Sequence, residues 1–301
     1  MRYFLIFLII FIPISVFADD IDPDDLEIGK KHEYIIRLKN GDILTGYVTG
    51  TAPGEEGGPA IRFRTELGTA LIYISQIEEI RPKEVAYRHS HRVFLLPTAE
   101  PIGGDHFIGM FEMLFLYGGA GIGDIVSITA GRSIVPGIDS RQQLTELNVK
   151  ATVYNTDFES MEGGMSFAVG GNMAWANHNN RLVHYYGVAT FRGFKSLITS
   201  AIFYKAGSED YYRLNFGQNA VDMTYADGSF GIGLGLDTRF TRWHGLHFIG
   251  ELWNSDITRP TNTGVLLGFR LSNSSFSADF GLSFFTQPLV APFASFVWTP
   301  F

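Results

Sequence analysis

Residues 230–240 read FGIGLGLDTRF, a stretch in which large apolar residues alternate with glycine or charged residues. From Phe230 to Leu236 every second residue is large and apolar, and the residues between them are glycines. Asp237 and Arg239 continue the second series. Because successive side chains of a β-strand point to opposite faces, this stretch predicts a strand with one apolar face and one face that is small or charged.

The same alternation recurs through residues 107–301. It is clearest at 144–153, 165–175 and 276–284, and further candidate strands lie at 107–117, 124–134, 182–191, 195–205, 245–253, 264–272 and 289–301. Together with 230–240 these make eleven candidates, whereas closed membrane barrels of bacteria have an even number of strands. The segment 210–227 can hold one more strand, so we expect about 10–12 strands, with 12 preferred.

A soluble β-sandwich also alternates, with its apolar face inside. Two features favour a membrane barrel instead. The second face carries mostly Gly, Ser, Ala and Asn, whereas a face turned to water usually carries Lys and Glu. Tryptophan stands at strand ends or turns, as in the aromatic girdles of membrane barrels, at Trp175, Trp243, Trp253 and Trp298.

The C-terminal residues add a resemblance. Phe293, Val297 and the final Phe301 alternate along the last candidate strand, although Thr299 and Pro300 do not fit the pattern. This ending resembles that of bacterial outer-membrane β-barrel proteins, whose last strand ends in an aromatic residue that is recognised during assembly. The resemblance implies a location in the bacterial outer membrane, with membrane lipid and the barrel-assembly machinery as partners.

The composition fits an all-β chain with an apolar surface. The 301 residues include 34 glycines and 26 phenylalanines, and 18% are charged, below the roughly 25% of ordinary soluble domains. The absence of cysteine excludes disulfides, thiolate metal sites and a lipid-modified cysteine. The formal net charge of −8 argues against a nucleic-acid partner.

Residues 1–18 have the pattern of a cleaved signal peptide: Arg2, a nearly continuous apolar run, and Val16 and Ala18 at the cleavage position. A membrane anchor is the alternative, but the run is shorter than the roughly 20 residues that a spanning helix needs. Residues 19–33 form an acidic linker, with six acids between Asp19 and Glu27. We expect a solvated tail there, since the spacing of a calcium loop is missing.

Residues 34–80 predict a small β module. Strands at 34–39 and 43–48 flank the hairpin turn Asn40-Gly41, and two more follow at 60–65 and 69–74. The spacing of Leu38, Asn40-Gly41 and Gly46, followed by isoleucines at 74, 77 and 80, resembles an Sm-like or SH3-like small barrel. We expect a periplasmic module that can bind a protein partner, and no RNA, because an exported acidic chain would meet none.

Residues 81–106 predict a connector. Arg81, Lys83, Arg88 and Arg92 surround His89 and His91, which indicates a solvated basic junction. A His-x-His pair on a strand can bind a metal, but a third ligand is not evident nearby. Pro97, Pro101 and Gly103-Gly104 then mark a boundary.

Five charges are predicted to face the barrel lumen: Asp237, Arg239, Glu251, Arg270 and Asp279. An isolated charge in a narrow lumen is costly, so we expect salt bridges among them. The alternative is a charged constriction that selects solutes.

Histidines that could serve an outer-membrane hydrolase stand at 178, 184, 244 and 247, but none lies in a catalytic motif. Gly231, Gly233 and Gly235 lie within one strand and do not form a dinucleotide loop. The sequence therefore predicts no catalytic residue, cofactor or metal site.

The sequence thus predicts an all-β chain, with an SH3/Sm-like module at 34–80 and an antiparallel transmembrane β-barrel at 107–301. We expect a structural, passive-transport or binding role in the outer membrane. A wide water-filled porin is disfavoured, because such lumens need about 16 strands. The alternatives are an outer-membrane lipid or peptide hydrolase and a secreted soluble β-sandwich that binds a ligand.

Overall fold

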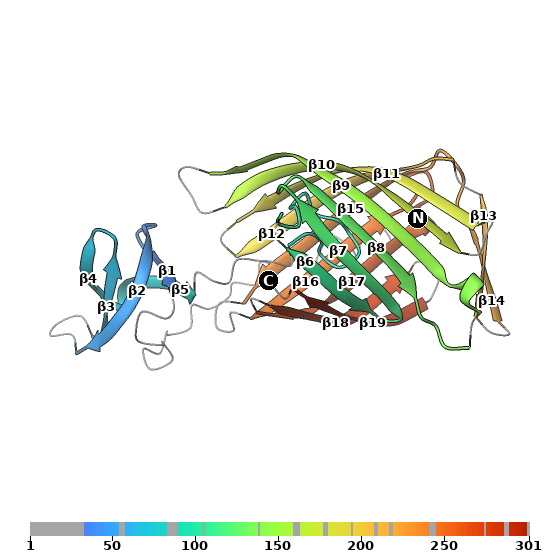
Figure 1. Cartoon of the computed structure of the whole chain (residues 1–301). Coiled ribbons are helices and arrows are strands. Elements are labelled where there is room, and N and C mark those ends of the chain that lie inside the picture. The colour runs from blue at the N-terminus through green and yellow to red at the C-terminus, as the bar shows by residue number, and fades with distance from the viewer. Residues whose placement is uncertain are drawn as a thin grey trace, which may run out of the picture. The chain divides into compact units, whose positions relative to one another are not determined.

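The computed structural model describes residues 33–53, 58–82, 90–104, 106–137, 139–158, 163–176, 180–193, 195–207, 210–216, 219–240, 245–273, 275–285 and 289–299. The predicted signal peptide and the acidic linker up to residue 32 lie outside these ranges. The chain divides into two units, an N-terminal sheet and a barrel (Figure 1). Within the described ranges, no helix has the length and hydropathy to cross a membrane.

The N-terminal unit is one antiparallel sheet with the strand order β4-β3-β2-β1-β5. A 3-10 turn, η2 (Ile74–Gln76), leads into the last strand. Its apolar side chains form one core that includes Ile36, Val48 and Phe63, each fully buried. The strands are β1 (Glu33–Leu38), β2 (Ile43–Ala52), β3 (Ala60–Thr65), β4 (Gly68–Tyr73) and β5 (Ile77–Pro82). The predicted strands and the turn at Asn40-Gly41 are confirmed, while the SH3/Sm likeness stays a prediction.

The second unit is a closed antiparallel barrel of twelve strands, in which the last strand pairs with the first (Figure 1). This confirms the preferred strand number. The barrel strands are β6 (Phe107–Glu112), β7 (Phe115–Ile122), β8 (Val126–Ser133), β9 (Leu144–Asp157), β10 (Gly164–Ala176), β11 (Asn180–Arg192), β12 (Ser196–Lys205), β15 (Phe230–Arg239), β16 (Leu246–Asn254), β17 (Thr263–Ser272), β18 (Phe276–Phe285) and β19 (Leu289–Trp298).

The twelfth strand does not come from 210–227. That segment forms a separate hairpin of β13 (Tyr211–Phe216) and β14 (Asn219–Thr224). Instead, the candidate strand 107–117 contains a turn at Met113-Leu114, where Met113 has a φ of 51°, and thereby divides into β6 and β7. Sequence alternation missed this turn because it contains neither glycine nor proline.

The barrel has two rims. The rim where the chain enters at Phe107 and leaves at Trp298, here called the terminal rim, carries the connections 123–125, 158–163, 193–195, 240–245 and 273–275. The opposite rim, here called the loop rim, carries the turn 113–114 and the connections 134–143, 177–179, 206–229, 255–262 and 286–288. Two short 3-10 turns lie in these longer connections, η3 (Ser140–Gln142) and η4 (Pro260–Asn262).

The outer wall of the barrel is apolar. Leu234 is 51% exposed and Phe296 is 60% exposed, and other large outward side chains are Val149, Val169, Ile198, Ile202, Leu267, Phe280 and Leu282. Soluble monomers rarely expose apolar surface over a whole wall, and this surface suits lipid. A single closed sheet also replaces the β-sandwich alternative.

The tryptophans divide between the two faces. Trp298 ends β19 on the outer wall and is 48% exposed, as a girdle residue would be. Trp253 lines an internal cavity instead, because it shares the inward face of β16 with Ile249 and Glu251. Trp243 lies outside the described residues.

Leu234→Arg should destabilise the barrel by about 2–4 kcal/mol in lipid vesicles, because it places a charge on the lipid-facing wall. Urea unfolding in vesicles measures this change. Ile257→Arg is the matched control, since Ile257 is 54% exposed but lies in a loop-rim connection, where the cost should be about 0–1 kcal/mol. Equal effects would mean that the wall at Leu234 faces water.

Candidate functional site

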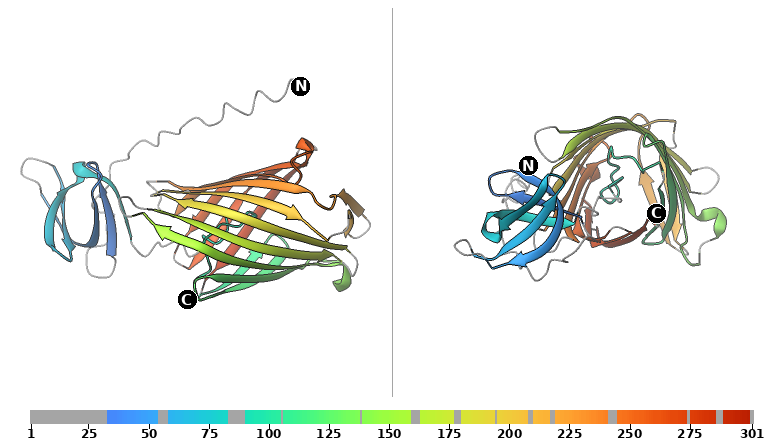
Figure 2. Two further views of the ribbon diagram at one scale, coloured as in Figure 1. Left: turned by 90° about the horizontal axis from the view of Figure 1, so that it is seen from above. Right: turned by 60° about the vertical axis from the view of Figure 1, so that its left-hand side comes forward.

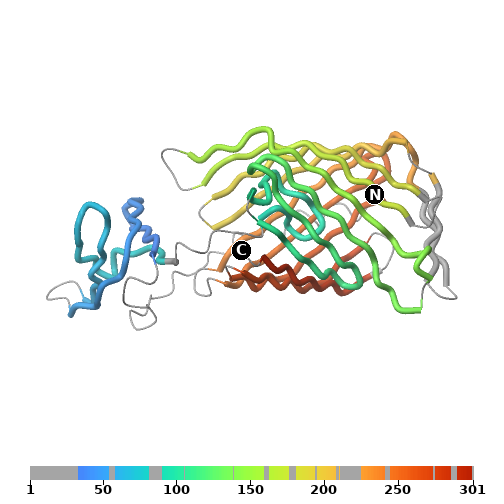
Figure 3. The backbone as a smooth tube through the Cα atoms, in the orientation of Figure 1, coloured from blue at the N-terminus to red at the C-terminus, as the bar shows by residue number. Residues whose placement is uncertain are grey.

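Residues 90–104, here called the plug, lie inside the barrel (Figures 2 and 3). Within the plug, residues 91–98 form a small hairpin in which Arg92 pairs with Pro97. The Val93 N–H donates to the Leu96 carbonyl at 3.0 Å. The Gly104 N–H donates to Asp124 at 2.6 Å, in the terminal-rim turn 123–125. The plug therefore passes into the lumen and leaves it at the terminal rim.

This position corrects the expectation of a solvated basic junction within 81–106. His91 is 7% exposed, and Arg92 forms an ion pair of 2.5 Å with Glu112 on β6. The physical reason is the apolar run from Val93 to Leu96, which is buried at the tip of the hairpin, apart from Leu95. His89 and residues 83–89 in general lie outside the described residues.

The plug packs against the inner wall through three apolar clusters. At the tip, Val93 and Phe94 contact Ile249, Leu266 and Phe293, and the Phe94 and Phe293 rings lie 4.1 Å apart between centroids. Further along the plug, Ala99 packs in a second cluster with Ala168, Tyr186, Val188 and Ala201. Ile102 packs in a third cluster with Ile108, Met110 and Val297.

The glycines of β15 make room for the plug. A Cβ atom at position 235 would lie 2.9 Å from Val93 Cγ2, and one at position 233 would lie 2.5 Å from Leu96 Cδ2. Both distances are too short for carbon atoms in contact. The plug therefore occupies the space that Gly233 and Gly235 leave on the inner face of β15.

Glu251 binds the tip of the hairpin through the main chain. Its Oε1 atom accepts hydrogen bonds from the N–H groups of Phe94, Leu95 and Leu96, at 2.6, 2.9 and 3.0 Å. Three consecutive peptide donors thus converge on one carboxylate, an arrangement that suits a negative charge. The sequence predicted that Glu251 forms salt bridges with the other lumen charges; in the structure its Oε1 atom accepts hydrogen bonds from the plug.

Lys150, on β9, binds the base of the hairpin as a hydrogen-bond donor, whereas Glu251 binds the tip as an acceptor. Its ammonium group donates to the carbonyl oxygens of His91, Thr98 and Glu100, at 3.1, 2.7 and 2.6 Å. An ammonium group has three N–H donors, so all of them are used. The Lys150 side chain is 3% exposed and fully committed to the plug.

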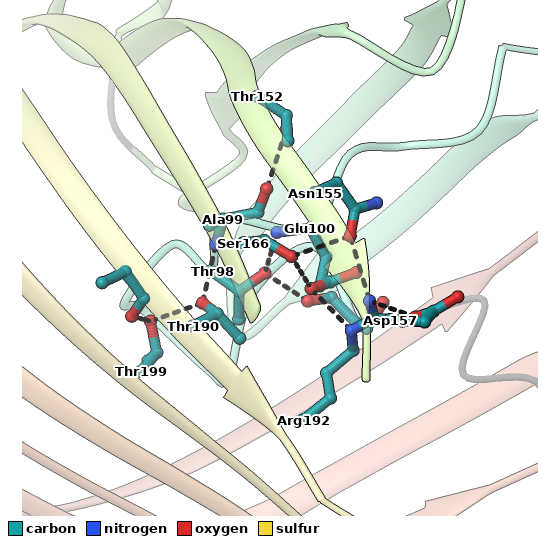
Figure 4. A network of polar contacts seen from close by, with 12 residues as sticks. Thr98, Ala99, Glu100, Thr152, Asn155, Asp157, Ser166, Thr190, Arg192 and Thr199 are labelled. Carbon is teal, nitrogen blue, oxygen red and sulfur yellow. Dashed lines mark hydrogen bonds and ion pairs between the residues drawn. The ribbon is translucent and has the colours of Figure 1, made fainter. Parts of the chain in front are cut away.

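Neutral hydroxyl groups bind the main chain of Ala99. The Ala99 N–H donates to Thr190 Oγ1 at 2.8 Å, and its carbonyl accepts from Thr152 Oγ1 at 2.7 Å (Figure 4). The Ile102 N–H likewise donates to Ser127 Oγ at 2.8 Å. Every one of these partners is a wall side chain.

Glu100 extends the network toward the terminal rim. Its carboxylate accepts from Ser166 Oγ at 2.6 Å and pairs with Arg192 at 3.1 Å (Figure 4). Arg192 also pairs with Asp157 at 2.8 Å. The plug therefore contributes a charge of its own to the interior of the barrel.

The five predicted lumen charges are all buried on the inner face. Arg270 joins two of them: its guanidinium lies 2.7 Å from both Asp237 and Asp279. The same group donates to the Val93 carbonyl of the plug. Arg239 is 3% exposed on the same face. His247, which the sequence offered only as a catalytic candidate, lies 2.6 Å from Asp237 through Nδ1.

The predicted assembly residues and the remaining histidines are placed as follows in the described part of the chain. Phe293 and Val297 point into the lumen, and the outward residues near the end of β19 are Phe296 and Trp298. Phe301, His178 and His244 lie outside the described residues. His184 faces the lumen and lies 3.1 Å from the Tyr225 hydroxyl. The described residues contain no cluster of three or more side chains suited to a metal ion.

A cavity of about 480 Å³ lies between the plug and the loop rim. The plug forms its floor, and its wall comes mostly from the loop-rim halves of the strands. The wall residues include Tyr117, Glu146, Asn148, Asn172, Leu182, His184, Tyr186, Phe203, Tyr225 and Trp253. Sequence reasoning missed this site, because its residues come from separate strands and from the plug.

Comparisons with known proteins give a likeness of form. No protein-family model and no curated protein matches the chain. The KdgM porin aligns with a TM-score of 0.40 and 8% identity, over 64% of this chain and 96% of that one. OccK5 (OpdH) of Pseudomonas aeruginosa aligns with a TM-score of 0.35 and 9% identity, over 90% and 96%. Both scores are below 0.5, and the likeness indicates no substrate.

Arg270→Ala should lower the free energy of unfolding in detergent by about 3–5 kcal/mol, because it leaves Asp237 and Asp279 buried without their cation. Leu234→Ala should cost less, since detergent or lipid fills the gap on the outer wall. Chemical unfolding followed by tryptophan fluorescence ranks the two variants. The reverse ranking would contradict the inward placement of Arg270.

Proposed function

We propose that this chain is a bacterial outer-membrane barrel for the passive transport of small solutes, and that the plug closes it at rest. Residues 1–18 direct export and are then cleaved as a signal peptide. The terminal rim faces the periplasm and the loop rim faces outward, since outer-membrane barrels have short periplasmic turns and longer outer loops. The module at 34–80 is then periplasmic.

The observation that carries the proposal is how the plug is held. Its peptide groups bond to wall side chains such as Glu251, Lys150 and Thr190, and not to the edge of a strand. The barrel ladder closes without the plug, between β19 and β6. The plug can therefore leave as a unit, whereas side chains that fill a barrel permanently cannot.

A lumen without the plug would expose charged groups beside the apolar wall residues that pack against the plug. Lys150, Glu251 and Arg270 would lose plug partners and face water together, which gives the wall charges of both signs. Twelve strands enclose a narrower lumen than the roughly 16 strands of general porins. The proposal is accordingly limited to small solutes.

A second candidate is a docking role for the N-terminal module. Strand β4 forms one edge of the sheet, and nearby Leu67 is fully exposed while Leu71 is 49% exposed. Open edges pair readily with a strand of another protein. We propose a periplasmic protein as the partner at this edge; in a purely docking protein the barrel would serve as an anchor and would not conduct.

Lys150→Ala should raise the open probability in planar bilayers by about tenfold or more, because three plug carbonyls lose their donor and each buried unpaired group costs about 1–3 kcal/mol. The wild-type protein should be mostly closed. Adding Leu96→Cys and Gly233→Cys to this variant should lock the plug, since the two side chains would meet in a chain that has no other cysteine.

The locked variant supplies its own control. Under oxidation the locked variant should not conduct, and reduction should restore its channel openings. The conductance of each single-cysteine variant should not change under either treatment. If neither the wild type nor Lys150→Ala conducts at any voltage, passive transport is rejected in favour of an anchoring barrel.

A further inference from the structure

Three tyrosines of the cavity have hydroxyl groups fixed by neighbours. The Tyr117 hydroxyl donates to Glu146 at 2.9 Å, and the Tyr186 hydroxyl donates to the Asn148 oxygen at 2.9 Å. The Tyr225 hydroxyl lies 3.1 Å from His184. Tyr117 and Tyr186 each donate their one hydroxyl proton to the partner, so their hydroxyl oxygens can still accept a hydrogen bond.

The same pairs leave donors beside these acceptors. The bond from Tyr186 uses only the oxygen of the Asn148 amide, so the amide nitrogen still offers N–H groups. The cavity wall therefore offers a hydrogen-bond donor beside its acceptors. A ligand hydroxyl group both donates and accepts, and it is the group that matches such a wall.

The charged groups around the cavity already have hydrogen-bond or ion-pair partners. Arg92 pairs with Glu112 at 2.5 Å, and the three Lys150 donors are used by plug carbonyls. Glu146 accepts from Tyr117. A charged ligand would have to lose water and compete with these existing partners, which is costly in a partly buried site.

Apolar side chains also line the cavity, including Leu182, Phe203 and the Trp253 ring. Such surfaces favour ligands with C–H faces between their polar groups. The cavity volume of about 480 Å³ lies within the roughly 300–1,000 Å³ of small-molecule sites.

We propose that this cavity binds a neutral, hydroxyl-rich ligand of the size of a disaccharide. The proposal names the solute class of the proposed transport function and rests on it for its biological meaning. Binding itself needs only the plug as the floor of the cavity. The ligand would enter from the loop rim and contact the plug residues Leu95, Leu96 and Pro97, so that its binding and the position of the plug are linked.

Isothermal titration of the full protein in detergent tests this with disaccharides of matched size: maltose, cellobiose and lactose as neutral probes, digalacturonic acid as the anion, and the glucosamine dimer as the cation. At least one neutral probe should bind more tightly than both charged ones. Tyr186→Phe should weaken that binding by about fivefold to tenfold, the effect of one lost hydrogen bond. Tyr185→Phe is the control, since Tyr185 is the next residue on β11 and is 58% exposed on the outer wall.

Tighter binding of a charged probe, no binding of any neutral probe, or equal loss in the two tyrosine variants would each overturn the proposal. Unheated gels confirm that both variants keep a closed barrel. Conductance is a separate readout: a protein that binds a neutral disaccharide but never conducts keeps this site and loses the transport function. A protein that conducts but binds no neutral disaccharide does the reverse.

Discussion

Peptide N–H groups inside a barrel need hydrogen-bond acceptors. The tip of the plug has three such N–H groups in succession, at Phe94, Leu95 and Leu96. The Glu251 carboxylate satisfies all of them within 3.0 Å. Buried peptide groups without partners would make a main-chain plug unstable. Lys150 answers the same need for three carbonyls at the base. Two wall charges of opposite sign therefore hold the hairpin by its backbone, at two points of its length.

The two faces of each barrel strand meet different surroundings. The outer face is apolar, and we expect other large apolar residues to be tolerated at Leu234 and Phe296. The inner face must match the plug: Gly233 and Gly235 leave space for it, and Arg270 bonds both to its carbonyl and to Asp237 and Asp279. Substitutions on the inner face should therefore act on the plug as well as on the barrel.

Alternation was sufficient to predict most of the barrel strands, since lipid outside and a small-residue interior impose a period of two. It gave the correct facing for Asp237, Arg270 and Asp279, although the extra strand came from the Met113 turn and not from 210–227. Alternation could not predict the plug, because its contacts join residues far apart in the sequence. Phe94 and Glu251, for example, are 157 residues apart. The one local signal was the apolar run at 93–96 within a connector that looked solvated.

Hydrogen–deuterium exchange of the purified protein in lipid nanodiscs tests most directly whether residues 90–104 fold inside the lumen. The amides of Phe94, Leu95, Leu96 and Ala99 should exchange slowly in the wild type, because each donates to a buried wall group. In Glu251→Ala the first three should exchange much faster, while the strand amides of β9 and β10 stay protected. Exchange of the 94–99 amides in the wild type at the rate of an unstructured peptide would contradict the plugged lumen.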